Sequence, residues 1–259
     1  MMNFNKKCFF VVSGLANELG KIVAIEFCKK FKAGSVVVLF EDSQPDLART
    51  KAAIYSLQNQ INVICCNIDW TQGRMDFFQN HLDEILSDLN RDDFEMAFIV
   101  HNEGAIATDV VCEPKNSDLW LHYVQISLNA TVGLNQAFLN TFKDTNKLVV
   151  NLTPSGQIIP FQFEKLKCSA KKARDMYFRA MAAAEDKVTV LNYRPGFLES
   201  FETNNQFDPN NNISEVQAIK VTLKAKKPYV KPMESVHKLI NTLEGSKFTS
   251  GHDVDYYSC

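Results

Sequence analysis

The sequence lacks the long hydrophobic run that a membrane-spanning helix requires, because no apolar stretch approaches about 18 residues. It also lacks an excess of either charge: the net charge is -2, which gives no general attraction to nucleic acid or to an anionic membrane. The seven cysteines form no CxxC motif, so neither a disulfide framework nor a metal site is indicated. No signal-peptide pattern accompanies the first apolar stretch, 8–12. We therefore expect a cytoplasmic protein with no nucleic-acid or membrane partner.

Short hydrophobic segments alternate with longer amphipathic ones along the 259 residues, without an internal repeat or a linker. The centres of the short segments are continuous Val, Ile, Leu, Phe and Cys, which is typical of strands buried on both faces of a parallel sheet. We predict one domain, residues 1–259, with an α/β fold: a doubly wound, mostly parallel Rossmann-type sheet with helices on both faces. The predicted strands are 8–13, 35–40, 61–66, 94–101, 147–152 and 188–193.

Helical patterns fill the spaces between these strands. A polar, turn-rich stretch at 204–212 precedes a Lys-rich helical segment that runs to about residue 227. A loop and helix at this place form either a lid over a substrate or a plain surface insertion, and both readings remain open. The predicted helices are 19–33, 45–58, 74–89, 118–142, 165–185 and 233–243, followed by a last strand near 254–257.

The turn after the first strand has the place of a phosphate-binding turn. In such folds the pyrophosphate of a dinucleotide meets backbone N–H groups where the first strand leads into the first helix. Gly14 permits a tight turn and Gly20 permits close packing of helix on strand, whereas Glu18 brings bulk and negative charge to a position that favours glycine. A nucleotide-binding turn and a purely structural turn are both compatible with this pattern.

The second strand ends in two acidic residues, Glu41 and Asp42. An acidic residue here accepts hydrogen bonds from the ribose hydroxyls of NAD, whereas a basic one accommodates the 2′-phosphate of NADP. The pair therefore favours NAD over NADP as a cofactor, if either binds. The alternative is a solvated acidic pair beside a helix.

Three segments resemble the short-chain dehydrogenase/reductase family and, within it, the sepiapterin reductases. They are 168–176 (CSAKKARDM), 190–196 (VLNYRPG) and 247–257 (KFTSGHDVDYY), and the likeness extends from about residue 8 to the C-terminus. The resemblance implies a Rossmann fold and NADP-dependent reduction of a pterin carbonyl, in tetrahydrobiopterin biosynthesis. It also implies a dimer formed through the two long helices, 118–142 and 165–185.

The resemblance implies a role for individual residues as well. Lys171 matches the lysine that holds the nicotinamide ribose, Asn129 matches the helix asparagine that supports it, and Asp255 matches the carboxylate that anchors a pterin. The remaining matches are with cofactor-binding positions: Gly14, Asn17, Gly20, Asp42, Asp69, Asn102, Gly104, Pro195 and Gly196.

The catalytic positions depart from the family pattern. Lys167 stands at the position of the catalytic Tyr, and Pro154 stands at the position of the catalytic Ser, flanked by Thr153 and Ser155. The family's Tyr gives a proton to the substrate carbonyl, and its Ser orients that carbonyl. Proline has no donor. Lysine has an ordinary pKa of about 10.4, which a second lysine one turn away, Lys171, would lower.

The cofactor positions depart too. Asn17 and Asp42 replace basic residues that contact the NADP phosphate, and Glu18 replaces a turn glycine. After the fourth strand the sequence is His101-Asn102-Glu103-Gly104, with Glu103 in place of a small residue. His101 is a candidate base, although a histidine that ends a buried strand is more often structural.

Two hypotheses follow from this pattern. The first is a sepiapterin reductase-like oxidoreductase with weak or absent activity, in which Lys167, Thr153 or Ser155 replaces the missing acid. The second is a non-catalytic relative that acts as a binding or regulatory protein, as a homodimer or in a heterodimer with an active relative. Loss of the catalytic and phosphate-binding positions, with retention of the strands and of the helix at 165–185, favours the second.

Overall fold

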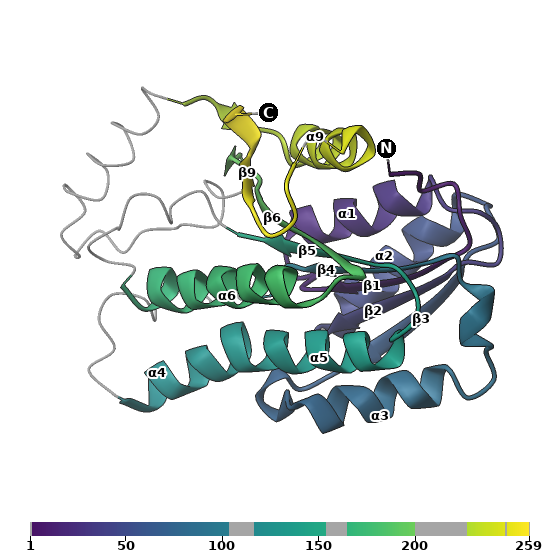
Figure 1. Ribbon diagram of the computed structural model, residues 1–259, viewed down its shortest axis with the longest axis horizontal. Coiled ribbons are helices and arrows are strands. Elements are labelled where there is room, and N and C mark those ends of the chain that lie inside the picture. Colours follow the sequence, from purple (N-terminus) through teal and green to yellow (C-terminus); the bar gives the residue numbers. More distant parts are fainter. Residues whose placement is uncertain (1, 104–116, 154–164, 200–226, 247, 259) are drawn as a thin grey trace.

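Seven parallel strands form the centre of the protein, in the order β3-β2-β1-β4-β5-β6-β9 (Figure 1). The computed structural model describes residues 2–103, 117–153, 165–199, 227–246 and 248–258. The strand order reverses between β1 and β4, which makes the C-terminal ends of these two strands the place where such sheets bind ligands. The strands are β1 (Cys8–Ser13), β2 (Val36–Glu41), β3 (Asn62–Asn67), β4 (Met96–His101), β5 (Lys147–Leu152), β6 (Val188–Arg194) and β9 (Asp253–Asp255).

Helices cover both faces of this sheet (Figure 1). One face packs against α1 (Glu18–Cys28), α2 (Gln44–Tyr55) and α9 (Pro232–Gly245). The other packs against α3 (Met75–Ile85), α5 (Thr131–Thr141) and α6 (Lys165–Ala184). In the described ranges, no helix has the length and apolar character needed to cross a membrane. The shorter elements are α4 (Ser117–Val124), η4 (Gln125–Ala130), β7 (Phe197–Leu198), β8 (Tyr229–Val230) and 3-10 turns at Trp70–Gln72, Arg91–Asp93 and Tyr256–Ser258.

The structure confirms the predicted doubly wound fold and its six main strands, each to within two residues at either end. Four helical predictions need correction. The first helix ends at Cys28 instead of reaching 33, because the chain tightens into a bond from Lys30 N to Phe27 O (2.9 Å). The second helix, α2, ends at Tyr55 instead of 58. The third ends at Ile85 instead of 89. The predicted helix 118–142 is three segments, because η4 is a π-helical turn between α4 and α5.

The C-terminal prediction was one residue late: β9 is Asp253–Asp255, and the chain then continues as a 3-10 turn instead of a strand. The predicted loop and Lys-rich helix, 204–227, lie almost entirely outside the described residues. The choice between a lid and a surface insertion therefore stays open.

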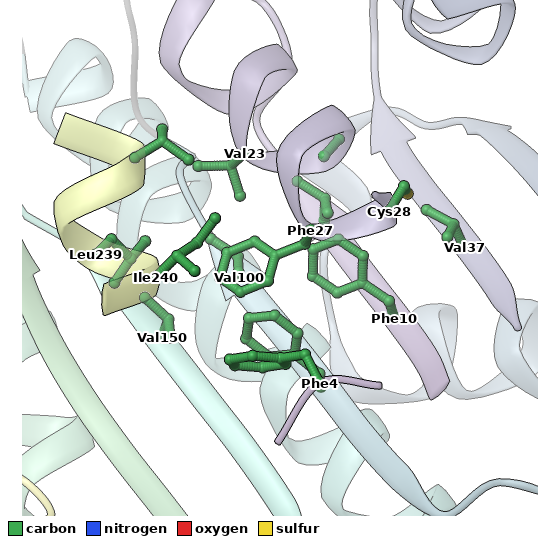
Figure 2. Packing of buried hydrophobic residues seen from close by; sticks show 14 of the residues in the cluster. Phe4, Phe10, Val23, Phe27, Cys28, Val37, Val100, Val150, Leu239 and Ile240 are labelled. Carbon is green, nitrogen blue, oxygen red and sulfur yellow. The ribbon is translucent and has the colours of Figure 1, made fainter. Parts of the chain in front are cut away.

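Phenylalanine rings fill the core between the sheet and α1 (Figure 2). Phe98 of β4 stacks on Phe10 of β1 with ring centroids 4.6 Å apart, and it meets Phe27 of α1 edge-on at 4.7 Å. Phe4 closes this cluster, 5.1 Å from Phe27 and 5.8 Å from Phe98. Offset and edge-to-face contacts are the arrangements that aromatic rings prefer, so the cluster fixes α1, and the turn that precedes it, against β1 and β4.

We predict that Phe98→Ala lowers the free energy of unfolding by about 3–5 kcal/mol, because it removes a buried ring that three other rings contact. Tyr55→Ala, at an exposed ring on α2, is the control and should cost less than about 1 kcal/mol. Urea unfolding followed by circular dichroism measures both. Equal costs for the two variants would contradict the packing described here.

Candidate functional site

The first turn is held closely against the end of β4. Gly14 has a φ of +79°, and a Cβ on it would lie 2.5 Å from the carbonyl carbon of Asn102. A Cβ on Gly20 would overlap the carbonyl oxygen of Gly14. Only glycine fits at either position. The structure therefore brings together three predicted residues, Gly14, Gly20 and Asn102. It also shows that close packing requires glycine at positions 14 and 20.

Asparagine side chains complete this turn. Asn102 donates through Nδ2 to Gly14 O (2.6 Å) and to Asn17 Oδ1 (3.0 Å). Asn17 Oδ1 also accepts from Gly20 N (3.0 Å), so Asn17 is the N-cap of α1. The side chain of Asn17, which was expected to contact the cofactor phosphate, thus has its amide oxygen engaged in hydrogen bonds within the protein.

Glu41, at the end of β2, lies with its carboxylate on the amides of the same turn. One oxygen accepts from Leu15 N and from Ala16 N (2.8 Å), and the other accepts from Asp42 N (2.9 Å). The side chain is buried, with 3% of the residue exposed. Burial, more than the neighbouring Asp42, raises the pKa of Glu41 to about 7. Sequence reasoning singled out Asp42 among the cofactor contacts, but Asp42 is exposed and Glu41 is the carboxylate that reaches the turn.

Negative charge surrounds the turn amides, by which we mean the N–H groups of Leu15 and Ala16. Glu18 begins α1 and is exposed, and exposed Asp42 follows Glu41. The nearby Lys21 forms an ion pair with Asp46 of α2 (2.6 Å). The electrostatic environment is therefore unfavourable to a phosphate group.

Glu103 points into the protein from the loop after β4. It accepts a hydrogen bond from Ser13 Oγ, contacts His101 Nδ1 (3.0 Å) and forms an ion pair with Arg174 Nη1 of α6 (3.5 Å). Arg174 is fully buried and also donates to Leu152 O (2.7 Å) and to Glu103 O (3.1 Å). The carboxylate that replaces a small residue therefore joins β1, β4 and α6 from inside.

The charge of Glu103 depends on these partners. Burial alone would raise the pKa of its carboxyl, but His101, Arg174 and Ser13 outweigh burial and lower it to about 2. His101 also contacts Asn135 Oδ1 of α5 through Nε2 (3.3 Å). Both ring nitrogens of His101 are thus engaged in the interior, which favours the structural reading of this residue over a catalytic base.

The catalytic positions are described only in part. Lys171 of α6 is buried and donates to Glu103 O (3.4 Å). The helix includes Lys167, but its side chain lies outside the described residues, as do Pro154, Ser155 and Gly104. Thr153 is described: it is buried, and its hydroxyl donates to Asp175 Oδ2 of α6 (3.5 Å).

Asn129 lies in the π-helical turn that follows α4. Its side chain is exposed and donates to Gln125 Oε1 (3.0 Å), one turn earlier on the same face, and its support of Lys171 stays a prediction. The buried polar residues of this segment are Ser127 and Thr131. The π-helical turn at this point changes which side chains face inward, and a 3.6-residue periodicity cannot reveal that.

Asp69 is exposed and caps a 3-10 turn: its Oδ1 accepts from Thr71 N (2.9 Å) and Thr71 Oγ1 (2.6 Å), which lowers its pKa. The contact of Asp69 with an adenine stays a prediction. Asp69 therefore has a local structural function that the sequence did not suggest.

The predicted residues at the other end of the sheet lie together near β6 and β9. Gly196 has a φ of +84°, and Pro195 O accepts from Ser235 Oγ (2.8 Å). Asp255 of β9 is buried and accepts from Tyr257 N (2.9 Å). In the sheet, β5 and β6 separate β9 from β4, so Asp255 is not part of the first turn.

Sequence reasoning missed a buried polar ladder beneath this edge. Asn151 of β5 donates to Asp175 Oδ1 and to Asn192 Oδ1 of β6, both at 2.9 Å. Burial raises the pKa of Asp175. The available signal was the presence of asparagines inside two apolar strands.

A doubly wound parallel sheet with a glycine-containing first turn defines a protein with the Rossmann fold. A family model described as short chain dehydrogenase matches residues 9–211, and the chain belongs to that family. It is similar to sepiapterin reductase from Xenopus laevis (25% identity; 95% of this chain, 94% of the relative) and from Mus musculus (27%; 95% of each).

Solved structures show the same fold. A short-chain type dehydrogenase/reductase from Mycobacterium ulcerans has a TM-score of 0.76 at 16% identity, over 98% of this chain and 89% of that one. Actinorhodin polyketide ketoreductase with NADPH has a TM-score of 0.73 at 14% identity, over 98% of this chain and 97% of that one.

We predict that Glu103→Gln lowers the free energy of unfolding by about 3–5 kcal/mol, because it leaves the charge of Arg174 buried without its partner. Glu84→Gln, on exposed α3 surface, is the matched control and should cost less than about 0.5 kcal/mol. The ordinary pKa of Glu103 is near 4.5, so its stabilisation is present above that pH and is lost as pH falls towards about 2. Urea unfolding from pH 7 to pH 3 measures both effects, and a variant with an unchanged acid limb would contradict the assignment.

Proposed function

We propose that this chain is a sepiapterin reductase-like member of the short-chain dehydrogenase/reductase family that has lost hydride transfer. It acts as a non-catalytic binding or regulatory protein. One observation carries this proposal: the hydroxyl beside Pro154, that of Thr153, is buried and donates to Asp175. A proton donor that is turned into the protein cannot serve a carbonyl at the sheet edge.

The chemistry of carbonyl reduction explains why that contact matters. When hydride reaches a carbonyl carbon, the oxygen must receive a proton, and a positioned acid contributes about 10²–10⁴-fold to the rate. Pro154 has no proton to give. Lys167 and Ser155 are the remaining candidates at that place, and both side chains lie outside the described residues. The ordinary pKa of lysine, about 10.4, lies far above neutral pH, so Lys167 is poorly matched to this role.

The described residues also do not fit NADP, the cofactor that the resemblance implies. Glu41 engages the turn amides, and Glu18 and Asp42 add negative charge where a phosphate would need positive charge. A nicotinamide cofactor is what the family suggests, and NAD, without a 2′-phosphate, conflicts less with these carboxylates.

A second candidate function is slow, NAD-dependent reduction of a pterin carbonyl. The position of Lys171, held at Glu103 O, and the presence of Asp255 at the pterin-anchoring place favour it. In this case Lys167 supplies the proton. Turnover with NADH but not with NADPH would support this function and contradict the first.

Exposed apolar side chains support the binding function. Leu121 of α4 is 68% exposed and Met176 of α6 is 58% exposed, with Trp120 of α4 also exposed. Helices α4 and α6 contact one another and lie at the same end of the molecule (Figure 1). We propose that this surface, defined by Trp120, Leu121 and Met176, packs against a second copy of the chain.

We predict that the purified chain oxidises neither NADPH nor NADH in the presence of sepiapterin, as followed by nicotinamide absorbance. We further predict that Lys167→Tyr combined with Pro154→Ser does not restore turnover, because the carboxylates at the turn remain. Circular dichroism verifies that the double variant is folded. Clear reductase activity in the double variant would contradict the view that the cofactor site is also lost, and activity in the unmodified chain would contradict the proposed function.

We predict that Leu121→Glu combined with Met176→Glu converts a dimer into a monomer, because it places charge within an apolar contact. Met233→Glu, at a 39% exposed side chain of α9 on the opposite face of the sheet, is the matched control and should leave the dimer intact. Light scattering after size exclusion measures the molar mass. A monomeric unmodified chain would contradict the proposed surface.

A further inference from the structure

The carboxylate of Glu41 has the coordination of a bound anion. One oxygen accepts from two consecutive backbone amides, Leu15 N and Ala16 N, and the other accepts from Asp42 N. Successive N–H groups that converge in a turn form a concave anion site. Here the anion belongs to the protein itself.

The backbone around Glu41 holds the carboxylate in this place. Gly14 N donates to Phe40 O (3.3 Å), so the turn begins directly beside the end of β2. Ile68 N donates to Glu41 O (3.0 Å), which fixes the other side of β2. These backbone hydrogen bonds fix the main chain on both sides of Glu41. From this position its side chain reaches the turn amides.

We propose that Glu41 is the specificity-determining group of the first turn: it occupies the turn amides as an internal anion and excludes the phosphate groups of nucleotides. This inference rests on the proposed function in one respect, the absence of NADP binding. It goes further because it assigns the absence of NADP binding to a single side chain, that of Glu41, which a substitution can remove.

The surrounding charges act in the same direction. An incoming phosphate must displace one buried carboxylate and then remain near two more, Glu18 at the start of α1 and Asp42 at the end of β2. On α2, Asp46 is engaged with Lys21. Each of these carboxylates repels a phosphate group, and the repulsion is stronger near the protein surface than it would be in bulk water.

The exclusion should weaken as pH falls. Burial, with a smaller contribution from Asp42, raises the pKa of Glu41 to about 7, so the carboxyl gains a proton near neutral pH. A neutral carboxyl holds amides less strongly than a carboxylate does. Nucleotide binding then requires less displacement at pH 6.5 than at pH 8.

The test is NADPH titration of the full chain and its variants, followed by nicotinamide fluorescence and by thermal stability. We expect Glu41→Ala and Glu41→Gln to bind NADPH about tenfold or more tightly than the unmodified chain at pH 8. Glu84→Gln, on the exposed surface of α3, is the matched control, because it removes one carboxylate charge away from the turn amides, and it should change the affinity by less than about twofold. The affinity of the unmodified chain should rise from pH 8 to pH 6.5, and that of Glu41→Gln should change less.

A folded Glu41→Gln variant that binds NADPH no better than the unmodified chain would overturn the inference, and so would an equal gain in Glu84→Gln. Glu41→Gln keeps the side-chain shape, so the test remains decisive if Glu41→Ala does not fold. The readout is binding, and therefore it is independent of turnover. Sepiapterin reduction by the unmodified chain would contradict the proposed function, whereas unchanged NADPH affinity in the Glu41 variants would contradict only the role of Glu41.

Discussion

A fully buried guanidinium is the constraint on which the centre of this protein depends. Arg174 is within the protein interior, where an unpaired charge costs several kcal/mol, and the Glu103 carboxylate supplies the opposite charge. The same carboxylate bonds to Ser13 of β1 and contacts His101 of β4. One ion pair therefore positions α6 against the two central strands, and with α6 it positions Lys171. The end of β4 is used for internal packing in a fold that commonly binds ligands at this edge.

Glu41, at the end of a neighbouring strand, is a second buried carboxylate that binds partners within the protein. Glu41 and Glu103 follow from the ends of β2 and β4, on either side of β1 in the sheet, and both carboxylates turn towards partners inside the protein. Burial raises the pKa of both carboxyls, but at Glu103 the neighbouring His101 and Arg174 outweigh it and the pKa falls, whereas at Glu41 burial prevails and the pKa rises. The two acids therefore differ in what they bind: Glu103 compensates a buried positive charge, whereas Glu41 binds backbone amides of the first turn.

The strands and the fold class could be predicted from the sequence, because a strand buried on both faces needs an uninterrupted apolar run, and such runs are visible without a structure. The orientation of polar side chains could not. Asn129 was expected to support Lys171, and the structure has its side chain exposed within a π-helical turn. Asp42 was expected at the cofactor, and the side chain of the preceding residue, Glu41, is the one that reaches the turn amides. Hydrophobic periodicity does not resolve which of two neighbouring polar side chains reaches such a place.

The family residues that this chain keeps have structural reasons of their own. Gly14 and Gly20 are required by the close approach of the turn to β4, and Asn102 bonds to the turn and to the N-cap Asn17. These contacts stabilise the Rossmann fold whether or not a dinucleotide binds, so the presence of such residues is weak support for a cofactor. Other positions of the family pattern distinguish an active reductase from an inactive relative. They supply hydroxyl groups for the substrate and positive charge for the cofactor phosphate. Those are the positions at which this chain has a proline, a lysine and an aspartate, and that distribution is what the retention of a fold without its reaction predicts.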